Sequence, residues 1–468
     1  MTNLRQLESW LGPCEVVGNP MQTFDRVHTD TRTIEAGDLF VALQGEKFDG
    51  SEFLDEAKGR GAVAAIASSA KLLETAGLSG LVVSDAKTSL GRIAKAWRAQ
   101  FNLSLIAVTG SNGKTTVTQM VNSILQDFKG VDGLATNGNF NNAIGVPLTL
   151  LRLRANHKVA VVEMGMNHPG EIELLALIAQ PTIALVNNAQ REHLEFMESV
   201  EAVARENGTV IRVLGSQGVA VLPVHDAFFE FWRGLSAQRG HLSFGLNIDG
   251  IRGDIFCEKP LWSDGAWQVA VQTPLGQIQV GLHVAGIHNV TNALAAIACC
   301  FAAGIPLNSI RQGLERFRAV KGRSCVHNIQ LKNHAVTLVD DSYNANPDSV
   351  RAAIDLLVEL PGPHLLILGD MGEVGDQGIA LHFEVGLYAK TKGIEALFSI
   401  GGLCESGCKA FNTGTHFADI DSLNLAVSSS LIQFASVLVK GSRFMRMERV
   451  VQYALAQQQQ QNLEASCC

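Results

Sequence analysis

The chain has 468 residues, of which 47% are hydrophobic and 18% charged, and its formal net charge is −8. This length predicts two to four globular domains, and the negative charge argues against a nucleic-acid-binding protein. The longest apolar stretch, residues 293–303, is too short to cross a bilayer, and the N-terminus has no charged-then-apolar signal segment. Nine irregularly spaced cysteines indicate reduced thiols, and we read Cys404 and Cys408 as structural. We therefore expect a soluble cytoplasmic protein without membrane insertion.

The first predicted block covers residues 1–99. Short apolar runs at residues 38–43 and 62–67 indicate strands, and residues 53–60 follow a helical pattern. This mixture predicts a small α/β domain.

A glycine-rich segment at residues 108–116, Val-Thr-Gly-Ser-Asn-Gly-Lys-Thr-Thr, is the most informative part of the chain. It lies between an apolar run and a helix-patterned stretch, which predicts a strand, a tight turn and a helix start. Backbone N–H groups of such a turn bind phosphate, Lys114 reaches the outer phosphates, and a threonine hydroxyl can bind magnesium. The general motif has a glycine where this chain has Val108, and the turn glycine is Gly110 instead.

The second block covers residues 100–316. Strand candidates at residues 159–162, 183–186 and 218–222 alternate with helical stretches, which predicts a mostly parallel sheet wrapped by helices. Alternating polar and apolar residues at 242–284 predict antiparallel strands at one edge of this sheet.

Polar residues follow several of these strands. Glu163 lies where a magnesium ligand is expected beside a phosphate loop, although an ordinary strand-end acid fits the pattern too. His193 could be a metal ligand, a general base or a loop residue. The amide-rich loop at residues 136–142 can bind a sugar or phosphate, or simply form turns. Asn289 and Asn292 open an alanine-rich helix and could read a nucleotide base.

The third block covers residues 317–468. Its strand candidates are residues 335–339, 365–368, 397–400 and 436–439, and Asn346-Pro347 is a typical helix start. These elements predict a second α/β domain of nucleotide-binding type. Arg323 suits the charge on a transferring phosphoryl oxygen, and polar clusters at residues 340–347, 369–373 and 440–443 follow strands. The glutamine-rich tail after Ala456 is expected to extend or fray the last helix.

Together these residues resemble the Mur ligase family over nearly the whole chain. The resemblance rests on the phosphate loop, Glu163-Met164-Gly165, His193, His288-Asn289 to Asn292, Gly322-Arg323 and the Asp341 loop, in the order and spacing of that family. The third-block clusters with His382 are similar to the member that adds a D-alanyl dipeptide, and the Asp-Asn-Pro-Arg motif of the member that adds diaminopimelate or lysine is absent from the sequence. Asp30-Thr31-Arg32 and Asp49-Gly50 are similar to the UDP-sugar-binding domain of both members.

The resemblance implies a three-domain α/β fold: a small UDP-binding domain, a central P-loop domain with a mostly parallel sheet, and a C-terminal Rossmann-like domain. It implies an enzyme that uses ATP and Mg²⁺ to join D-alanyl-D-alanine to UDP-N-acetylmuramoyl-tripeptide through an acyl phosphate, for peptidoglycan synthesis. We expect a monomer by default. A sibling ligase that adds diaminopimelate or lysine, a folylpolyglutamate synthase, and a nucleotide-binding protein with a degenerate site are the alternatives.

The resemblance also implies roles for individual residues. The catalytic residues would be Lys114, Glu163, His193 and Arg323. ATP would be bound by Gly110, Ser111, Asn112, Gly113, Lys114, Thr115, Thr116, Asn289, Asn292, Arg323 and Asp341. The other substrates would be bound by Thr31, Arg32, Asn139, Asn141, Asn142, Asn344, Asn346 and His382, and magnesium by Thr115, Glu163 and His193.

The chain departs from the family pattern at Asn207. Members often have a carbamoylated lysine in an Ala-Lys-Xaa-Lys-Gly segment, and residues 204–208 of this chain read Ala-Arg-Glu-Asn-Gly. A carbamate offers a negative oxygen to a second magnesium ion, whereas Asn207 offers a neutral one. We expect that Glu206 or solvent substitutes, or that the second metal binds more weakly, and that activity needs no carbamoylation. A smaller departure, Ser51 in place of a histidine, concerns only the uridine site.

Overall fold

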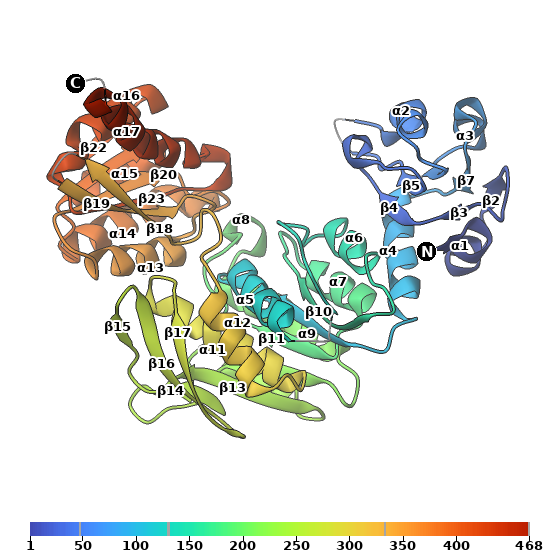
Figure 1. Ribbon diagram of the computed structural model, residues 1–468, viewed down its shortest axis with the longest axis horizontal. Coiled ribbons are helices and arrows are strands. Elements are labelled where there is room, and N and C mark those ends of the chain that lie inside the picture. Colours follow the sequence, from blue (N-terminus) through green and yellow to red (C-terminus); the bar gives the residue numbers. More distant parts are fainter. Residues whose placement is uncertain (46–47, 129–131, 332–333, 467–468) are drawn as a thin grey trace.

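The computed structural model describes residues 1–45, 48–128, 132–331 and 334–466. Within these residues the strands form a five-stranded, a ten-stranded and a six-stranded sheet, and β1 (Thr2–Asn3) and β3 (Thr23–Phe24) form a small separate pair. Figure 1 shows the three large sheets, each with its own helices, following one another along the chain. The three-domain α/β fold expected from the sequence is confirmed.

The first sheet has the order β2-β7-β6-β5-β4, and only the pairing of β2 with β7 is antiparallel. Its strands are β2 (Glu15–Val17), β4 (Arg26–His28), β5 (Asp38–Val41), β6 (Ala64–Ala67) and β7 (Ser79–Val82). Its helices are α1 (Leu4–Leu11), α2 (Leu54–Gly59), α3 (Ala70–Ala76) and α4 (Ala86–Arg98). The two strands and the helix predicted in this block are confirmed.

The second sheet has the order β15-β16-β14-β13-β12-β11-β8-β10-β9, with β17 paired to β16. Its strands are β8 (Ser104–Thr109), β9 (Asp132–Ala135), β10 (His157–Glu163), β11 (Ile183–Val186), β12 (Val219–Pro223), β13 (Gly240–Leu246), β14 (Ile255–Cys257), β15 (Leu261–Ser263), β16 (Ala266–Thr273) and β17 (Gly276–Leu282). Strands β8 to β14 are parallel to one another, and β15 to β17 form the antiparallel edge. The prediction of antiparallel strands from residue 242 was wrong for β13, because helix α10 crosses over between β12 and β13 and returns the chain in the parallel direction.

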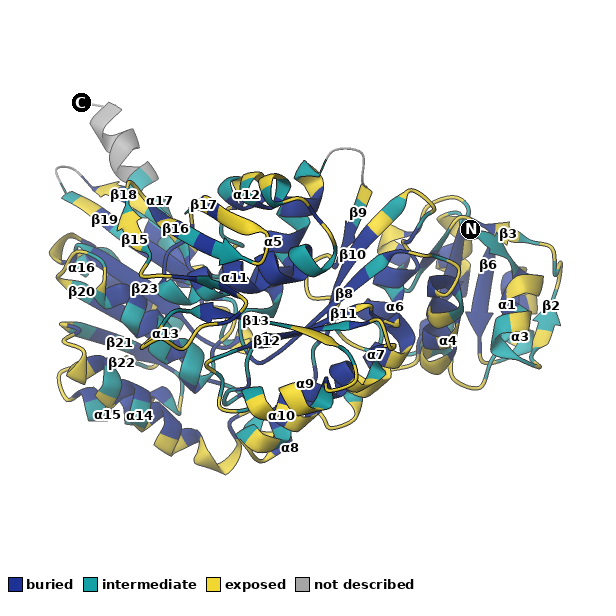
Figure 2. Cartoon of the chain, turned by 90° about the horizontal axis from the view of Figure 1, so that it is seen from below, coloured by how far each residue is buried: buried dark blue, intermediate teal, exposed yellow. Residues whose placement is uncertain are grey.

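Helices cover both faces of the second sheet (Figure 2). They are α5 (Lys114–Asp127), α6 (Gly145–Leu150), α7 (Glu171–Ala179), α8 (Leu194–Met197), α9 (Val200–Val213), α10 (Phe229–Leu235), α11 (Ile287–Ala302) and α12 (Leu307–Arg316). Alternate residues of β8 point to opposite faces: Ile106 packs with α5 and α11, and Leu105 packs with α4 and α7. The apolar stretch at residues 293–303 forms most of the buried helix α11, as predicted.

The third sheet has the order β18-β19-β23-β20-β21-β22, parallel except for the edge strand β18. Its strands are β18 (Cys325–Leu331), β19 (His334–Asp341), β20 (His364–Gly369), β21 (Ala396–Ile400), β22 (Thr415–Phe417) and β23 (Ser436–Lys440). Helices α13 (Pro347–Val358), α14 (Gly378–Thr391) and α15 (Cys404–Phe411) cover one face, and α16 (Ile420–Ser430) and α17 (Glu448–Ser466) the other. The four predicted strands and the glutamine-rich extension of the last helix are confirmed.

None of the helices in the described part of the chain combines the length and apolarity that a bilayer crossing requires.

Candidate active site between the second and third sheets

The carboxyl ends of the second and third sheets line one cavity of about 1090 Å³. Ligands of open α/β sheets bind at this edge, where loops follow the strands. The cavity brings together most of the residues predicted from the sequence. These are Ser111 to Thr116, Asn139, Asn141, Asn142, Glu163, His193, Asn289, Asn292, Arg323, Asp341, Asn344 and Asn346. Gly110, Thr31, Arg32 and His382 do not line it.

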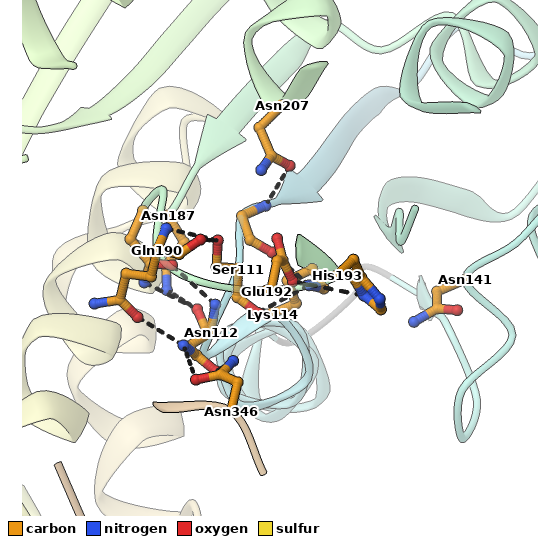
Figure 3. Close-up of polar contacts among 12 residues, drawn as sticks. Ser111, Asn112, Lys114, Asn141, Asn187, Gln190, Glu192, His193, Asn207 and Asn346 are labelled. Carbon is orange, nitrogen blue, oxygen red and sulfur yellow. Dashed lines mark hydrogen bonds and ion pairs between the residues drawn. The ribbon is translucent and has the colours of Figure 1, made fainter. Parts of the chain in front are cut away.

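The phosphate loop connects β8 to α5 through two glycines with positive φ, Gly110 at 126° and Gly113 at 83°. A Cβ atom on Gly113 would lie 2.3 Å from Oδ1 of Asn292, so both the backbone angle and the space require glycine. The loop is held from outside by two side chains. Asn188 accepts a hydrogen bond from the N–H of Asn112 at 2.8 Å, and Asn207 accepts one from the N–H of Gly110 at 3.0 Å (Figure 3). The loop therefore has a fixed shape.

The Lys114 ammonium lies against the loop and a buried acid. It donates to the carbonyls of Gly110 and Ser111, and lies 3.3 Å from Oε2 of Glu192, which is 6% exposed (Figure 3). The same carboxylate oxygen is 3.8 Å from Nε2 of His193. The sequence prediction missed Glu192, although its place next to His193 in a loop after a parallel strand was an available signal.

Glu163 has the properties of a magnesium ligand. It is 2% exposed, and its Oε1 accepts a hydrogen bond from Nδ2 of Asn141 at 2.8 Å. Its Oε2 is buried and has no hydrogen-bond partner among the described residues. A buried carboxylate oxygen without a donor is unfavourable unless a cation approaches it. Because the hydroxyl-bearing Thr115 lines the same cavity, this part of the site fits a hard cation with oxygen ligands.

His193 connects the second sheet to the third. Its Nδ1 lies 2.6 Å from Oε2 of Glu373, which follows β20, and this close approach of the His193 ring lowers the pKa of Glu373. The backbone N–H of Glu195 also donates to the carbonyl of Glu373 at 3.2 Å. His193 is thus paired with a carboxylate from the third sheet at the cavity wall.

A second group of contacts joins the two sheets through Arg191. Its guanidinium binds Asp348, in the first turn of α13, with Nη2 2.7 Å from Oδ1. Its Nη1 is 2.7 Å from Oε2 of Glu384 in α14, and Arg351 binds the other oxygen of Glu384 at 3.0 Å. These hydrogen bonds raise the pKa of Arg191 and lower that of Glu384. The sequence prediction missed this interdomain network.

Amide side chains form a third contact between the sheets. Nδ2 of Asn346 donates to Oδ1 of Asn112 at 3.0 Å, and Nδ2 of Asn112 lies 3.3 Å from Oδ1 of Asn346 (Figure 3). Within helix α11, Nδ2 of Asn292 donates to Oδ1 of Asn289 at 3.0 Å, and both side chains are buried at the cavity wall.

The third sheet contributes Arg323 and Asp341 to the cavity. The Arg323 guanidinium stacks over the Tyr343 ring at 4.2 Å. Asp341 accepts a hydrogen bond from the N–H of Ser324 at 2.9 Å and forms an ion pair with the buried Lys440. Asp341 therefore also fixes the loop that carries Arg323.

His382 is not placed to contact a substrate, so this prediction was wrong. It is fully buried, its Nε2 accepts a hydrogen bond from the N–H of Met371 at 2.8 Å, and its Nδ1 lies 2.6 Å from the carbonyl of Gly378. The nearby Asp370 accepts the N–H of Cys404 at 2.7 Å. Although ligand atoms of Asp370, His382 and Cys404 lie within 4.8 Å of one another, the first two are bonded to backbone groups. They hold the loop that precedes Glu373.

Thr31 and Arg32 lie outside this cavity, in the short 3-10 helix η1 (Thr31–Thr33) of the first domain. The predicted substitutes for the carbamoylated lysine also lie outside it. Asn207 faces Gly110, and Oε1 of Glu206 accepts the N–H of Ile172 at 2.8 Å, in the first turn of α7. Of the three expected possibilities, replacement of the carbamate by Glu206 was wrong, because its carboxylate accepts a hydrogen bond from the first turn of α7 instead. Substitution by solvent and weaker binding of the second metal stay predictions.

Comparison with known proteins identifies the class. Residues 23–98 match the Mur ligase family catalytic domain, residues 108–300 the Mur ligase middle domain, and residues 326–443 the Mur ligase glutamate ligase domain. The chain belongs to the Mur ligase family.

Individual relatives narrow the resemblance. The UDP-N-acetylmuramoyl-tripeptide–D-alanyl-D-alanine ligase of Escherichia coli (strain K12) is 39% identical over 433 residues, which cover 92% of this chain and 93% of that protein. The enzyme of the same name from Haemophilus influenzae is 37% identical over 449 residues, covering 93% and 95%. The crystal structure of MurF from Acinetobacter baumannii superposes with a TM-score of 0.87 at 33% identity, covering 97% of this chain and 99% of that one.

Proposed function

We propose that this protein is an ATP-dependent ligase that adds D-alanyl-D-alanine to UDP-N-acetylmuramoyl-tripeptide and forms ADP, phosphate and UDP-N-acetylmuramoyl-pentapeptide. One observation carries this function: a single cavity is lined by a phosphate loop, by Glu163 with an unpartnered carboxylate oxygen, and by polar loops of the third sheet. The full-length similarity to enzymes of this name supports the same substrates. Peptidoglycan precursor synthesis is therefore its role.

The reaction has two steps, because a carboxylate is a poor electrophile. The terminal carboxylate of the tripeptide attacks the γ-phosphorus of ATP, and the bond to ADP breaks to give an acyl phosphate. The dipeptide amine then attacks the acyl carbon, loses a proton, and phosphate leaves from the tetrahedral intermediate. Lys114 and the loop N–H groups neutralise phosphate charge in the first step, and Arg323 acts from the third sheet.

Magnesium would be held by Thr115, Glu163 and His193. When bound, it supplies positive charge to the phosphate oxygens. Asn289 and Asn292 are proposed to contact the adenine, and Asn139, Asn141 and Asn142 the donor peptide. Thr31 and Arg32 would bind the UDP part, with Asn344 and Asn346 near the acceptor. His382 supports the site without touching a ligand.

We further propose domain limits of 1–99, 100–316 and 317–468. The connection between α4 and β8, residues 99–103, and the segment between α12 and β18, residues 317–324, support these limits. A cytoplasmic monomer is the state proposed, because ATP and the UDP-linked donor are cytoplasmic compounds.

The test is phosphate release by the purified protein with ATP and Mg²⁺, with the UDP-tripeptide and D-Ala-D-Ala supplied separately and together. We expect phosphate release only when both substrates are present. Mass spectrometry should then detect UDP-N-acetylmuramoyl-pentapeptide as the product. Release with the UDP-tripeptide and a different amine would assign a sibling reaction. ATP binding without turnover under any of these conditions would indicate a degenerate site. Lys114→Ala serves as the inactive control.

A further inference from the structure

The acceptor dipeptide carries a carboxylate that takes no part in the reaction, and the cavity must accommodate its charge. An unpaired carboxylate brought into a partly enclosed site is costly, so a cation is required near the acceptor end. The cations that line the cavity from the third sheet are Arg323, Lys440 and Arg443. The other lysines that line the cavity are Lys114 of the phosphate loop and Lys87 of α4, which lie outside the third domain.

Two of the three third-sheet cations are excluded, Lys440 by its buried contacts and Arg323 by its proposed role at the nucleotide. Lys440 is 3% exposed, pairs with Asp341 and donates to the carbonyl of Asn344 at 2.9 Å. Arg323 lies on the Tyr343 ring beside the loop fixed by Asp341, in the position proposed for the nucleotide. Arg443 is the cation that remains.

Arg443 begins η5 (Arg443–Met445), directly after the loop that follows β23. Its side chain is 61% exposed, and its Nη1 lies 3.2 Å from Oε1 of Glu448. Within the described part of the chain, this is the only hydrogen bond found for its guanidinium. The guanidinium also lies 5.5 Å from the centre of the Tyr343 ring. Arg443 is therefore oriented by Glu448 and Tyr343 while its other N–H groups are free to bind a ligand.

The loop of Arg443 is joined to the loop that reaches His193. The Ser442 hydroxyl accepts the N–H of Gly372 at 2.6 Å and donates to the carbonyl of Ala345 at 3.1 Å. Gly372 immediately precedes Glu373, the partner of His193. A Cβ atom on Gly372 would lie 2.9 Å from the ring of Phe444, which is 64% exposed and also lines the cavity. A cation and an apolar ring thus stand side by side at this wall.

We propose that Arg443 binds the carboxylate of the acceptor dipeptide and that Phe444 contacts its methyl groups. A guanidinium matches a carboxylate in a two-point arrangement, and the dipeptide offers one carboxylate and two small apolar side chains. The amine lies at the opposite end of the dipeptide from the carboxylate, and Arg443 and the phosphate loop line the same cavity. Binding of the carboxylate by Arg443 therefore leaves the amine free to attack the acyl phosphate. The inference rests on the proposed function and assigns a specificity residue to it.

The test is steady-state kinetics of the full-length enzyme and its Arg443→Ala and Arg443→Lys variants, with each substrate varied in turn. We expect Arg443→Ala to raise the KM for D-Ala-D-Ala by roughly 10- to 100-fold, as for loss of a charge-assisted hydrogen bond, and to leave the KM values for ATP and UDP-tripeptide within about twofold. Arg443→Lys should recover part of the loss. Arg233→Ala is the matched control, because Arg233 is an exposed arginine on α10 that also pairs with a glutamate, Glu230, and does not line the cavity.

The C-terminal amide of the dipeptide gives a second, independent readout. The wild-type enzyme should use the amide far less well than the acid, and Arg443→Ala should use the two about equally. Unchanged discrimination in Arg443→Ala, or a raised KM for ATP or UDP-tripeptide instead, would overturn the inference. Absence of dipeptide ligation by the wild-type enzyme would instead overturn the proposed function. If Arg443→Ala does not fold, the preference of Arg443→Lys for the dipeptide acid over its amide is measured instead. A preference weaker than that of the wild type supports the inference, and an unchanged preference overturns it.

Discussion

Asn207 holds the phosphate loop from behind. Its Oδ1 accepts a hydrogen bond from the backbone N–H of Gly110 at 3.0 Å, and Asn207 is 1% exposed. Asn207 does not line the cavity, so it acts on the nucleotide site through the loop rather than through a metal ion. Its position is the one where the family resemblance places a charged, carbamoylated lysine.

Replacing Asn207 by alanine should destabilise the loop. The variant would leave the Gly110 N–H buried and unpaired, which costs about 1–3 kcal/mol. We expect a comparable decrease in the free energy of unfolding, measured by urea denaturation, together with a raised KM for ATP and little change in the KM for D-Ala-D-Ala. An equal rise in the KM values for ATP and for D-Ala-D-Ala would contradict a role confined to the loop.

Activity should be independent of bicarbonate. Neither Asn207 nor Glu206 can be carbamoylated, and both face backbone N–H groups instead of the cavity. Assays in buffers freed of carbon dioxide should give the same kcat as assays with added bicarbonate. Loss of activity without bicarbonate and its recovery on addition would show that a lysine elsewhere supplies a carbamate.

Glu163→Gln should weaken the response to magnesium. The change removes the charge of a buried carboxylate whose Oε2 is unpartnered, while keeping its shape. We expect the Mg²⁺ concentration for half-maximal activity to rise about tenfold or more and kcat to fall, in a titration with ATP held constant. Glu173→Gln, on the exposed side of α7, is the control. An unchanged Mg²⁺ titration would remove Glu163 from the proposed metal site.

Arg191→Ala should loosen the third domain from the second. The substitution breaks the pairs with Asp348 and Glu384. It leaves the partly buried Asp348 carboxylate without its cation and Glu384 paired with Arg351 of its own domain. We expect a larger radius of gyration in small-angle X-ray scattering and a kcat/KM for the dipeptide lower by about tenfold. Arg205→Ala is the control, because Arg205 is exposed and, among the residues that the structure describes, pairs with Glu201 of its own helix alone. An identical scattering curve for Arg191→Ala would contradict the prediction.

His382 should make stability sensitive to mild acid. Burial lowers its pKa from 6.5, so the folded state keeps it neutral where the unfolded chain binds a proton. Stability should therefore be constant above about pH 6.5 and decrease as the pH falls below that value. His382→Gln should flatten this pH dependence in unfolding experiments between pH 5 and 8, roughly the range in which histidine titrates. The variant should also be somewhat less stable than the wild type at neutral pH. If the free energy of unfolding of the variant depends on pH as steeply as that of the wild type, another titrating group causes the effect.

Local patterns predicted much of the fold. The strand, glycine turn and helix around Lys114 and the capped start of α13 depend on neighbouring residues, and the capping box of Asn346 with Ser349 is present. Short elements such as β22 and the antiparallel edge strand β18 were not predicted, because they are stabilised by pairing with distant strands.

The candidate site divides in the same way. Residues that directly follow predicted strands, such as Glu163 and His193, were found from their positions in the sequence. Glu192 was missed although it directly precedes His193 in the sequence. The pairing of His193 with Glu373 was not predicted, because it joins loops of two different sheets that are far apart in the sequence. The orientation of Asn207 and the burial of His382 likewise depend on packing between elements far apart in the sequence.

The reciprocal amide contact between Asn112 and Asn346 has a kinetic consequence. Asn346 is also the residue whose side chain caps the first turn of α13, so the tip of the phosphate loop and the start of that helix share one hydrogen-bonded group. Nucleotide that shifts Asn112 must therefore shift the neighbouring wall on which the acceptor is proposed to bind. We expect a compulsory binding order, with ATP first and the dipeptide last, seen as substrate inhibition by the dipeptide at low ATP.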